Sequence, residues 1–470
     1  MNIVKKIVLN SSYVIVGRVL NILLRLVPVI LMIRYLGSEL YGVYSFVLAF
    51  VYIFAVFADL GIDKILIREI SKNKDKLDEY VGSIVVLKII IVFILIFVII
   101  IVSKMLNLSE IKFIGIVITS FFLIFYSLIV PCSAYFRVNL EMQYPMLATL
   151  LGSITFIILI LWFINMKLSI YYFFLAYVIS YMVNTMFIYF FSIKFHEITP
   201  KIDTKNWKYF IKISISLGII SIFSKLNDRI GILILSWLKD DKAVGYFTAP
   251  LAITTKLEII PFAVMLSLFP FFSKFYKSSK DKWEKSFELS FKYMLILSMF
   301  PAVISTIYSK EIIILIFGDE FLKSSSVFSI LMWGLVFLFL NFVLIDVITS
   351  AGRQKILIPI FGFTFISTII VNVILVPEYS FLGTAAAYVM SKLIVTLLCI
   401  YYLFTRLSLY PKPSILIKIM ISTILLLGIL SYIHISLWLA IPLITIIYII
   451  LLFSFKILDI NDINLFKKGY

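Results

Sequence analysis

Two arginines and an asparagine lie inside an apolar stretch long enough to cross a membrane, and together they could bind an anion. Arg18 and Arg25 are seven residues apart with Asn21 between them, so a helix presents all three on one face. A cation at the centre of a bilayer costs about 2.5–3.5 kcal/mol on insertion scales. Two cations on one face therefore predict a face that lines a water-filled cavity and receives a negatively charged group.

A second polar cluster lies in a later apolar stretch, residues 208–238, where Ser224 accompanies several charged side chains. Arginine grips phosphate oxygens through its planar fork and stays protonated at physiological pH. We interpret the two clusters as one site for an anionic head group, with the predicted residues Arg18, Asn21, Arg25, Ser221, Lys225, Asp228 and Arg229. The alternative is a structural ion pair, such as Arg25 with Asp228, and both arrangements could occur in different conformations.

Two further carboxylates lie at the end of the second apolar stretch. Asp59 and Asp63 are four residues apart and therefore share one face of a helix, near the predicted cytoplasmic mouth. The favoured interpretation is a salt-bridge cluster at the membrane interface, in which Lys64 and Arg68 are the partners.

Other charges lie deeper in apolar stretches, where ionisable residues are often functional. Pro250 and Pro261 flank two of them and predict a break in the helix. The candidates for ion coupling or gating are Asp59, Lys256, Glu258, Asp346 and Lys392, although a carboxylate here could also simply pair with a lysine. Lys88 and Lys292 lie near the starts of their apolar stretches, and we expect both to extend to the cytoplasmic surface.

Composition indicates the class of protein. The chain has 470 residues, of which 63% are hydrophobic and 14% charged, and these values are typical of a polytopic membrane protein. The net charge of +17 lies mostly in short loops, where it sets orientation, so we expect no nucleic-acid partner. Cys132 and Cys399 lie in separate apolar stretches and predict neither a disulfide nor a metal site.

No motif for catalysis or cofactor binding is present in the sequence. There is no Walker loop, no dinucleotide glycine pattern and no Cys/His set with metal spacing, so we expect no cofactor, no metal and no enzymatic activity. A membrane enzyme acting on lipid-linked sugars is the alternative. Such an enzyme would usually show acidic residues clustered in its loops, whereas the long charged loops here contain mainly lysine.

The elements that must position these residues are about fourteen predicted membrane spans. Their approximate ranges are 8–34, 41–67, 80–104, 112–137, 142–166, 168–193, 208–238, 243–273, 288–309, 325–350, 355–376, 380–404, 414–433 and 436–456. With this count, the lysine-rich segments 72–76, 201–208 and 274–285 fall on the same side as the N-terminus. The positive-inside bias then predicts a protein of the cell membrane with both termini in the cytoplasm.

The spans show an internal repeat. A shift of 203 residues brings Lys5 onto Lys208 and Gly42 onto Gly245. Because six spans is an even number, the two halves predict a parallel repeat about an axis along the membrane normal. The predicted organisation is an N-terminal six-helix lobe at 1–194, a cytoplasmic linker at 195–207, a C-terminal six-helix lobe at 208–406, and two terminal helices with a cytoplasmic tail at 407–470.

Repeats of this kind favour a transporter that rocks two bundles about a site at mid-membrane depth. A structural duplication without transport, as in a membrane scaffold for glycan assembly, is the alternative. The predicted fold class is an all-α polytopic membrane protein, with two parallel-repeat lobes and a C-terminal helix pair.

The region around the first turn resembles a known family. The segments RYLGSELYGVY at 34–44 and ADLG at 58–61 are similar to the opening of the polysaccharide transporter family. That family is the lipid-linked oligosaccharide flippase branch of the multidrug/oligosaccharidyl-lipid/polysaccharide (MOP) exporter superfamily. The resemblance implies a cationic cavity that holds the phosphate–sugar head of a polyprenyl-(pyro)phosphate-linked glycan while the lipid tail stays in the bilayer.

The resemblance also implies the partners and the rival functions. The expected partners are the lipid-linked glycan, membrane lipids, and glycosyltransferases or a polymerase of the same pathway. The drug/cation antiporter branch of the superfamily is similar in architecture, but its cavities favour acidic residues. The peptidoglycan-precursor (lipid II) flippase branch is the nearer alternative.

Overall fold

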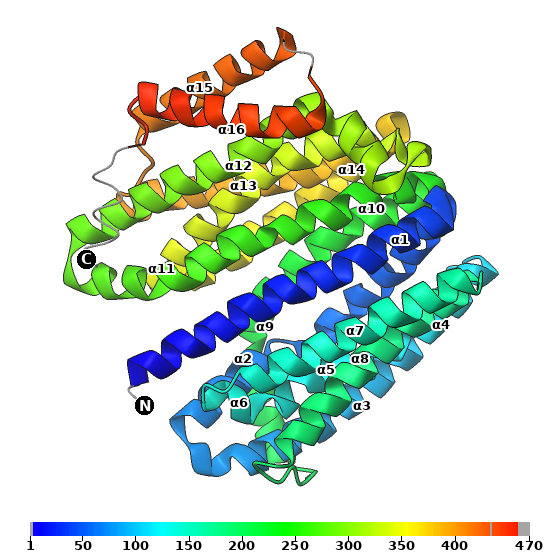
Figure 1. The fold of residues 1–470 in the computed structure, drawn as a ribbon. Coiled ribbons are helices and arrows are strands. Elements are labelled where there is room, and N and C mark those ends of the chain that lie inside the picture. The colour runs from blue at the N-terminus through cyan, green and yellow to red at the C-terminus, as the bar shows by residue number, and fades with distance from the viewer. Residues whose placement is uncertain (1–2, 433–434, 459–470) are drawn as a thin grey trace. The chain divides into compact units, whose positions relative to one another are not determined.

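A computed structural model describes residues 3–432 and 435–458 of the chain (Figure 1). For residues 3–8, 215–217 and 431–432 it describes the backbone alone. The described residues form helices joined by short turns, and they contain no strand. This arrangement confirms the all-α fold class. It follows from the long apolar segments, because only a helix satisfies its backbone hydrogen bonds within one segment of a lipid-exposed chain.

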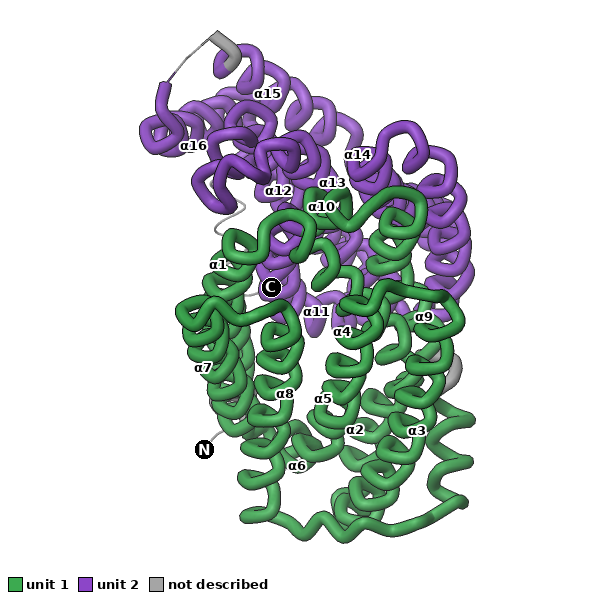
Figure 2. Tube along the Cα trace, turned by 90° about the vertical axis from the view of Figure 1, so that its right-hand side faces the viewer, with its two compact units in different colours: residues 1–248 green, residues 249–470 purple. Residues whose placement is uncertain are grey.

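The described chain divides into two compact units, residues 1–248 and 249–470, which are coloured separately in Figure 2. The first unit contains α1 (Ile3–Asp59), α2 (Ile62–Lys72), η1 (Lys74–Lys76), α3 (Leu77–Met105), α4 (Glu110–Ser120), α5 (Phe122–Cys132), α6 (Ala134–Val138), α7 (Gln143–Asn165), α8 (Ile170–Ser192), α9 (Thr204–Leu238) and most of α10 (Asp241–Thr254). In the second unit lie η2 (Thr255–Glu258), α11 (Ile259–Ser278), α12 (Lys280–Phe317), η3 (Asp319–Phe321), α13 (Ser324–Ser350), η4 (Gln354–Ile356), α14 (Leu357–Leu407), α15 (Pro413–Tyr432) and α16 (Leu437–Ser454).

Within the described residues, 11 helical segments are long and apolar enough to cross a membrane, or 12 if the two bent parts of α9 form one span. Two helices, α1 and α14, are more than twice as long as the about 20 residues that one crossing needs. α1 has 57 residues and is interrupted at Gly37 (φ 70°), and α14 has 51 residues and is interrupted at Ser380 (φ 50°). The protein is therefore a multi-pass membrane protein, and the predicted number of 14 spans stays a prediction.

The interruption of α14 reverses the chain. A Cβ placed on Gly383 would lie 2.6 Å from the carbonyl oxygen of Leu375, eight residues earlier. In an unbroken helix, residues eight apart are separated by about 12 Å along the axis. The two halves of α14 therefore run back along each other from Ser380, as the separate predicted spans 355–376 and 380–404 require.

In the first unit, α1 packs against α7, α9 and α4, and α8 packs against α7 and α5. Aromatic side chains fill the interface between α1 and α8. The rings of Tyr35 and Phe173 lie 5.5 Å apart, and those of Tyr44 and Phe174 lie 5.4 Å apart. Residues on either side of Gly37 thus contact neighbouring residues of α8, which is consistent with a sharp bend in α1 at that glycine.

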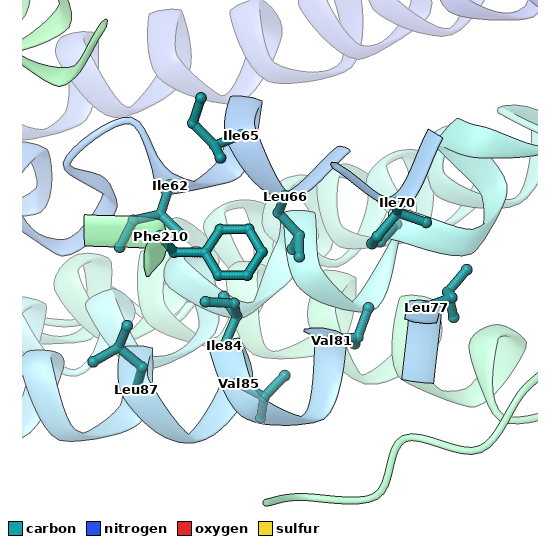
Figure 3. Close-up of a cluster of buried hydrophobic side chains, with 11 residues drawn as sticks. Ile62, Ile65, Leu66, Ile70, Leu77, Val81, Ile84, Val85, Leu87 and Phe210 are labelled. Carbon is teal, nitrogen blue, oxygen red and sulfur yellow. The ribbon is translucent and has the colours of Figure 1, made fainter. Parts of the chain in front are cut away.

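The second predicted span ends earlier than expected, because the helix breaks after Asp59. Leu60 (φ 46°) and Gly61 (φ 80°) both adopt left-handed backbone angles, and the short helix α2 starts in a new direction. Its apolar residues recur every three to four positions and form a buried cluster with α3, α6 and the first part of α9 (Figure 3). The members of this cluster are Ile62, Ile65, Leu66, Ile70, Leu77, Val81, Ile84, Val85, Leu87, Ala134 and Phe210.

α1 and α10 cross at very close range within the first unit. A Cβ on Gly42 would lie 1.7 Å from the carbonyl oxygen of Asp241, and a Cβ on Gly245 would lie 1.8 Å from that of Ser38. One turn further, the hydroxyls of Ser45 and Thr248 are hydrogen-bonded at 2.9 Å. We call these six residues the α1–α10 crossing.

The contacts of the α1–α10 crossing are reciprocal. Residue 42 meets residue 241, residue 245 meets residue 38, and residue 45 meets residue 248, which is 203 positions further along the chain. Such self-complementary pairing is the signature of a local two-fold axis. The shift of 203 residues found in the sequence is therefore also a spatial relation at this place.

Alanine at Gly42 is expected to destabilise the protein by about 1–3 kcal/mol, because the added methyl group would overlap a backbone carbonyl that cannot rotate away. The measurement is thermal unfolding of the detergent-solubilised protein. Gly428→Ala in α15 is the matched control, since a Cβ there meets nothing within 4 Å and alanine favours the helix by up to about 1 kcal/mol. Equal unfolding temperatures for the two variants would contradict the close crossing.

In the second unit, α13 packs against α11, α12 and α14, and the terminal pair α15 and α16 packs on α12. The expectation that Lys292 extends to the surface is wrong. Its side chain is buried, and its ammonium donates to the carbonyl oxygen of Ile457 at 3.0 Å. The chain after α16 folds back over α12 at this point, and its free carbonyl groups satisfy the lysine.

Candidate functional site

Arg25 and Asn21 meet on the predicted face of α1 through a hydroxyl of α7. Arg25 Nε donates to Ser153 Oγ at 3.1 Å, and that hydroxyl in turn donates to Asn21 Oδ1 at 2.5 Å. Ser153 is completely buried, so the arginine head is tied to a fixed point of the bundle. Arg25 and Asn21 thus lie on one face of α1, and the predicted place of Arg18 on that face stays a prediction.

Aromatic rings surround the guanidinium groups of Arg25 and Arg229. The Arg25 guanidinium carbon lies 5.1 Å from the ring centroid of Tyr181 and 5.7 Å from that of Phe156. The Arg229 guanidinium on α9 lies 5.1 Å from the ring of Tyr52 on α1. These separations are typical of cation–π contacts, which hold a guanidinium in place without neutralising its charge.

Three tyrosines connect the two arginines. The hydroxyls of Tyr52 and Tyr181 lie 3.2 Å apart, those of Tyr177 and Tyr181 lie 3.4 Å apart, and Tyr52 is also hydrogen-bonded to Tyr177. We call Tyr52, Tyr177 and Tyr181 the tyrosine cluster. It packs around the buried ring of Phe122, at centroid distances of 5.2–5.5 Å.

The tyrosine cluster therefore brings together arginines that are 204 residues apart in the chain. Arg25 lies against Tyr181, Tyr181 is hydrogen-bonded to Tyr52, and Tyr52 lies against Arg229. All of these residues belong to the first unit. The interpretation of the two polar clusters as one anion site stays a prediction.

Neither arginine is neutralised by a carboxylate in the part of the chain that the structure describes. The contacts of Arg25 are a hydroxyl and two rings, and that of Arg229 is a ring. The alternative ion pair between Arg25 and Asp228 is thus not formed in this structure. In this structure, rings and a hydroxyl hold the two guanidinium groups.

The other predicted anion-site residues occupy more open positions. Arg18 and Lys225 are exposed, and Ser221 and Asp228 are half-buried on α9. Arg18 lies close enough to Arg137 of α6 for their charges to interact. Arg137, which was not among the predicted residues, thus adds a cation near Arg18.

The expectation that Lys88 extends to the surface is wrong. Its side chain is 1% exposed, and its ammonium lies 2.5 Å from Asp63 Oδ1 and 3.9 Å from Asp59 Oδ1. The same ammonium donates to the carbonyl oxygen of Ser127 at 3.2 Å. The buried lysine is therefore the partner of both carboxylates.

The predicted cluster of Asp59 and Asp63 with Lys64 and Arg68 is also wrong. Arg68 pairs instead with Glu69, at 2.9 Å, and Lys64 is exposed. The physical reason is the helix break at Leu60–Gly61. It turns α2 so that Asp63 faces α3, and a straight helix would not have done so.

The four remaining candidates for ion coupling lie in the second unit. Lys256 and Glu258 are half-buried in the 3-10 turn η2, where the α-helical hydrogen-bond pattern changes between Pro250 and Pro261 while the helical path continues. Asp346 and Lys392 are half-buried on α13 and α14, and the Lys392 ammonium lies 4.8 Å from the ring of Tyr388. Their role in coupling stays a prediction.

The tyrosines and Ser153 were missed at the level of sequence. Tyr177 and Tyr181 are four residues apart and share a face of α8, which is a weak signal for a tyrosine-rich surface. Aromatic residues at helical spacing are far more often simple packing residues. Only their place around the two arginines distinguishes the tyrosine cluster and Ser153 from ordinary packing residues.

Comparison with solved structures defines the class of this fold. The structure superimposes on the lipid II flippase MurJ in an inward closed conformation with a TM-score of 0.77 and 18% sequence identity, covering 96% of this chain and 98% of that one. An inward-facing multidrug resistance MATE family transporter of the MOP superfamily gives a TM-score of 0.65 and 17% identity, covering 83% of this chain and 94% of that one. The fold is thus that of MOP superfamily transporters.

The family follows from the sequence comparisons. Residues 7–276 match the family described as polysaccharide biosynthesis protein, so the chain belongs to that family. The capsular polysaccharide biosynthesis protein CapF of Staphylococcus aureus is 22% identical over 406 residues, which cover 84% of this chain and 99% of that protein. The family resemblance based on residues 34–44 and 58–61 is confirmed.

Proposed function

We propose that the protein is a flippase for a polyprenyl-(pyro)phosphate-linked oligosaccharide, which it moves from the cytoplasmic to the outer leaflet for surface polysaccharide or glycoprotein assembly. The observation that carries this proposal is the pair of guanidinium groups, Arg25 and Arg229, gathered on the tyrosine cluster without a carboxylate partner among the described residues. Membership of the polysaccharide biosynthesis family supports the glycan part of the substrate.

In the proposed mechanism, the anionic head of the glycolipid exchanges its hydration for charge-assisted hydrogen bonds from the arginines. Asn21 and Ser153 hold Arg25 in place, and Arg18, Ser221, Lys225 and Asp228 complete the proposed head-group site. The lipid tail stays in the bilayer throughout. Transport then follows alternating access of the two proposed lobes, 1–194 and 208–406, joined by the linker 195–207 and followed by the terminal helices at 407–470.

The energy source in this proposal is the membrane potential or a coupled ion. Moving one charge through 100 mV is worth about 2.3 kcal/mol. If an ion is coupled, its proposed sites are Asp59, Lys256, Glu258, Asp346 and Lys392. No enzymatic step, cofactor or metal enters the mechanism, since the chemistry is binding and translocation alone.

A lipid II flippase is the second candidate, because the MurJ fold matches over nearly the whole of both chains. A drug/cation antiporter has the same fold but is less well supported. Its substrate would need carboxylates where Arg25 and Arg229 lie, since a cation is repelled by two unneutralised guanidinium groups.

Reconstitution into liposomes tests the proposal. A polyprenyl-pyrophosphate disaccharide in the inner leaflet should become accessible to an external glycosidase faster than in protein-free liposomes. A lipid II analogue in the same assay tests the second candidate. Transport of a quaternary ammonium dye without any movement of the glycolipid would overturn the flippase proposal and support the antiporter.

The proposed location is the cell membrane, with both termini in the cytoplasm and glycosyltransferases or a polymerase of the same pathway as partners. The lysine-rich segments 72–76, 201–208 and 274–285 support this orientation. Reporter fusions at the C-terminus and in the turn at 238–242 test it, because the two sites should report opposite sides of the membrane.

Tyr181→Leu is expected to lower the flipping rate about 5- to 10-fold, since it removes the ring that positions the Arg25 guanidinium. Tyr181→Phe keeps the ring, so it should lower the flipping rate less than Tyr181→Leu does. The rates are measured in the liposome assay. Tyr189→Leu is the matched control, because it removes an exposed ring from the same helix. Equal rates for Tyr181→Leu and the control would show that the ring does not position the arginine.

A further inference from the structure

An ion pair beside the α1–α10 crossing joins a helix of the first repeat to a helix of the second. The Lys112 ammonium on α4 lies 2.7 Å from Asp241 Oδ1 at the start of α10 and 2.9 Å from Ser236 Oγ at the end of α9. It also lies 4.5 Å from the ring centroid of Phe46 on α1. One side chain thus connects four helices of the first unit.

The ion pair holds the residue on which the crossing depends. Asp241 supplies the carbonyl oxygen against which Gly42 packs, and its side chain is the partner of Lys112. The Ser236 hydroxyl donates to the same carboxylate at 3.1 Å. While Lys112 is bound, the first turn of α10 is pinned against α1.

A cavity of about 330 Å³ borders this ion pair. Three carboxylates and three ammonium groups line it, namely Glu39, Asp240, Asp241, Lys112, Lys239 and Lys242. Such a cavity is polar and large enough to hold water, so the two ions can separate without being transferred into an apolar medium. The pair Lys88–Asp63 differs, because its lysine is sealed inside the bundle and cannot be hydrated there.

Close backbone contact and small side chains hold the crossing. Glycines allow the helices to approach closely, and the Ser45–Thr248 hydrogen bond joins α1 to α10 one turn further along.

We propose that Lys112 and Asp241 form a releasable latch that keeps the α1–α10 crossing closed at this end of the bundle. When Lys112 leaves Asp241 for the water of the cavity, the crossing opens. The role of this opening in a transport cycle rests on the proposed function, whereas the latch itself can be tested without any substrate. By the loop charges, this end is the proposed outer end.

The test uses the full chain in lipid nanodiscs, so that both faces are accessible. Ser45→Cys reports the opening, because Ser45 is 8% exposed and faces Thr248. A bulky water-soluble maleimide is the probe, and labelling of protein without this substitution measures the background from the buried Cys132 and Cys399. In this background-corrected assay, Lys112→Met and Asp241→Asn are each expected to raise the labelling rate about fivefold.

Lys242→Met is the matched control, since it removes a cation from the same cavity without touching the pair, and it should leave the labelling rate unchanged. Exchanging the charges, as Lys112→Asp with Asp241→Lys, should restore slow labelling. Slow labelling in both Lys112→Met and Asp241→Asn would overturn the latch. An equal rise in the labelling rate of the control Lys242→Met would also overturn the latch.

A disulfide between Ser45→Cys and Thr248→Cys then tests whether the crossing must open during transport. In the liposome assay, the cross-linked protein should lose flipping, and a reductant should restore it. Full flipping with the cross-link intact would overturn the role of the latch in transport. Fast labelling of Lys112→Met in a protein that moves no glycolipid would instead refute the proposed function and leave the latch standing.

Discussion

Arg25→Ala is expected to lower the rate of glycolipid flipping about 10- to 100-fold, with lipid-linked glycan accumulating on the cytoplasmic leaflet. The side chain supplies charge-assisted hydrogen bonds to a phosphate, and each such bond contributes about 1.5–3 kcal/mol. Ser153, Phe156 and Tyr181 hold the guanidinium in place, so no neighbouring cation can take over its position. A leaflet-resolved glycolipid assay in a deletion strain carrying the variant measures the effect.

Arg25→Lys separates charge from geometry. It keeps the positive charge and loses the planar fork, so its rate should lie between those of the wild type and Arg25→Ala. Arg229→Ala should resemble Arg25→Ala, because both guanidinium groups lie on the tyrosine cluster. Arg406→Ala removes an exposed arginine at the end of α14 and serves as the control. Normal surface glycan in both Arg25→Ala and Arg229→Ala would refute the anion site.

Lys88→Met is expected to destabilise the protein by about 3–5 kcal/mol, the largest effect on stability predicted for this chain. The substitution leaves Asp63 without the ammonium that lies 2.5 Å from its carboxylate, and Asp59 without its neighbour at 3.9 Å. A half-buried carboxylate that loses its buried partner keeps the part of its desolvation penalty that the ammonium offset. Thermal unfolding in detergent, followed by size-exclusion chromatography, measures the change.

Two further variants isolate the cause of that destabilisation. Lys72→Met removes an exposed lysine that pairs with Glu69 at 2.9 Å, and its cost should stay below about 1 kcal/mol. Lys88→Met combined with Asp63→Asn removes both charges of the closest pair and should recover part of the lost stability. If the double variant is no more stable than Lys88→Met, the ion pair is not the source of the effect.

The sequence alone predicted the positions of several helices closely, because the thickness of the bilayer and the rise of a helix are local constraints. The predicted spans 80–104 and 142–166 correspond to α3 (Leu77–Met105) and α7 (Gln143–Asn165). The repeat was also visible, since a duplicated gene leaves matched residues at a constant shift. Gly42 and Gly245 were found in this way, and they meet across the α1–α10 crossing.

Part of the candidate site was also predictable. A cation inside an apolar stretch is conspicuous in any sequence, so Arg25 and Arg229 could be selected from it, and the structure places both on the tyrosine cluster. Their surroundings could not be predicted, because Ser153, Tyr52 and Tyr181 look like ordinary packing residues until the helices are assembled.

The partners of the buried charges were decided by the tertiary structure alone. Lys88 meets Asp63 because two left-handed residues, Leu60 and Gly61, end one helix and redirect the next, and no periodic pattern encodes that turn. Lys112 meets Asp241 across 129 positions of the chain. Hydropathy and helical spacing act over a few turns of one helix, whereas the pairing of charges depends on which helices pack together and at what rotation.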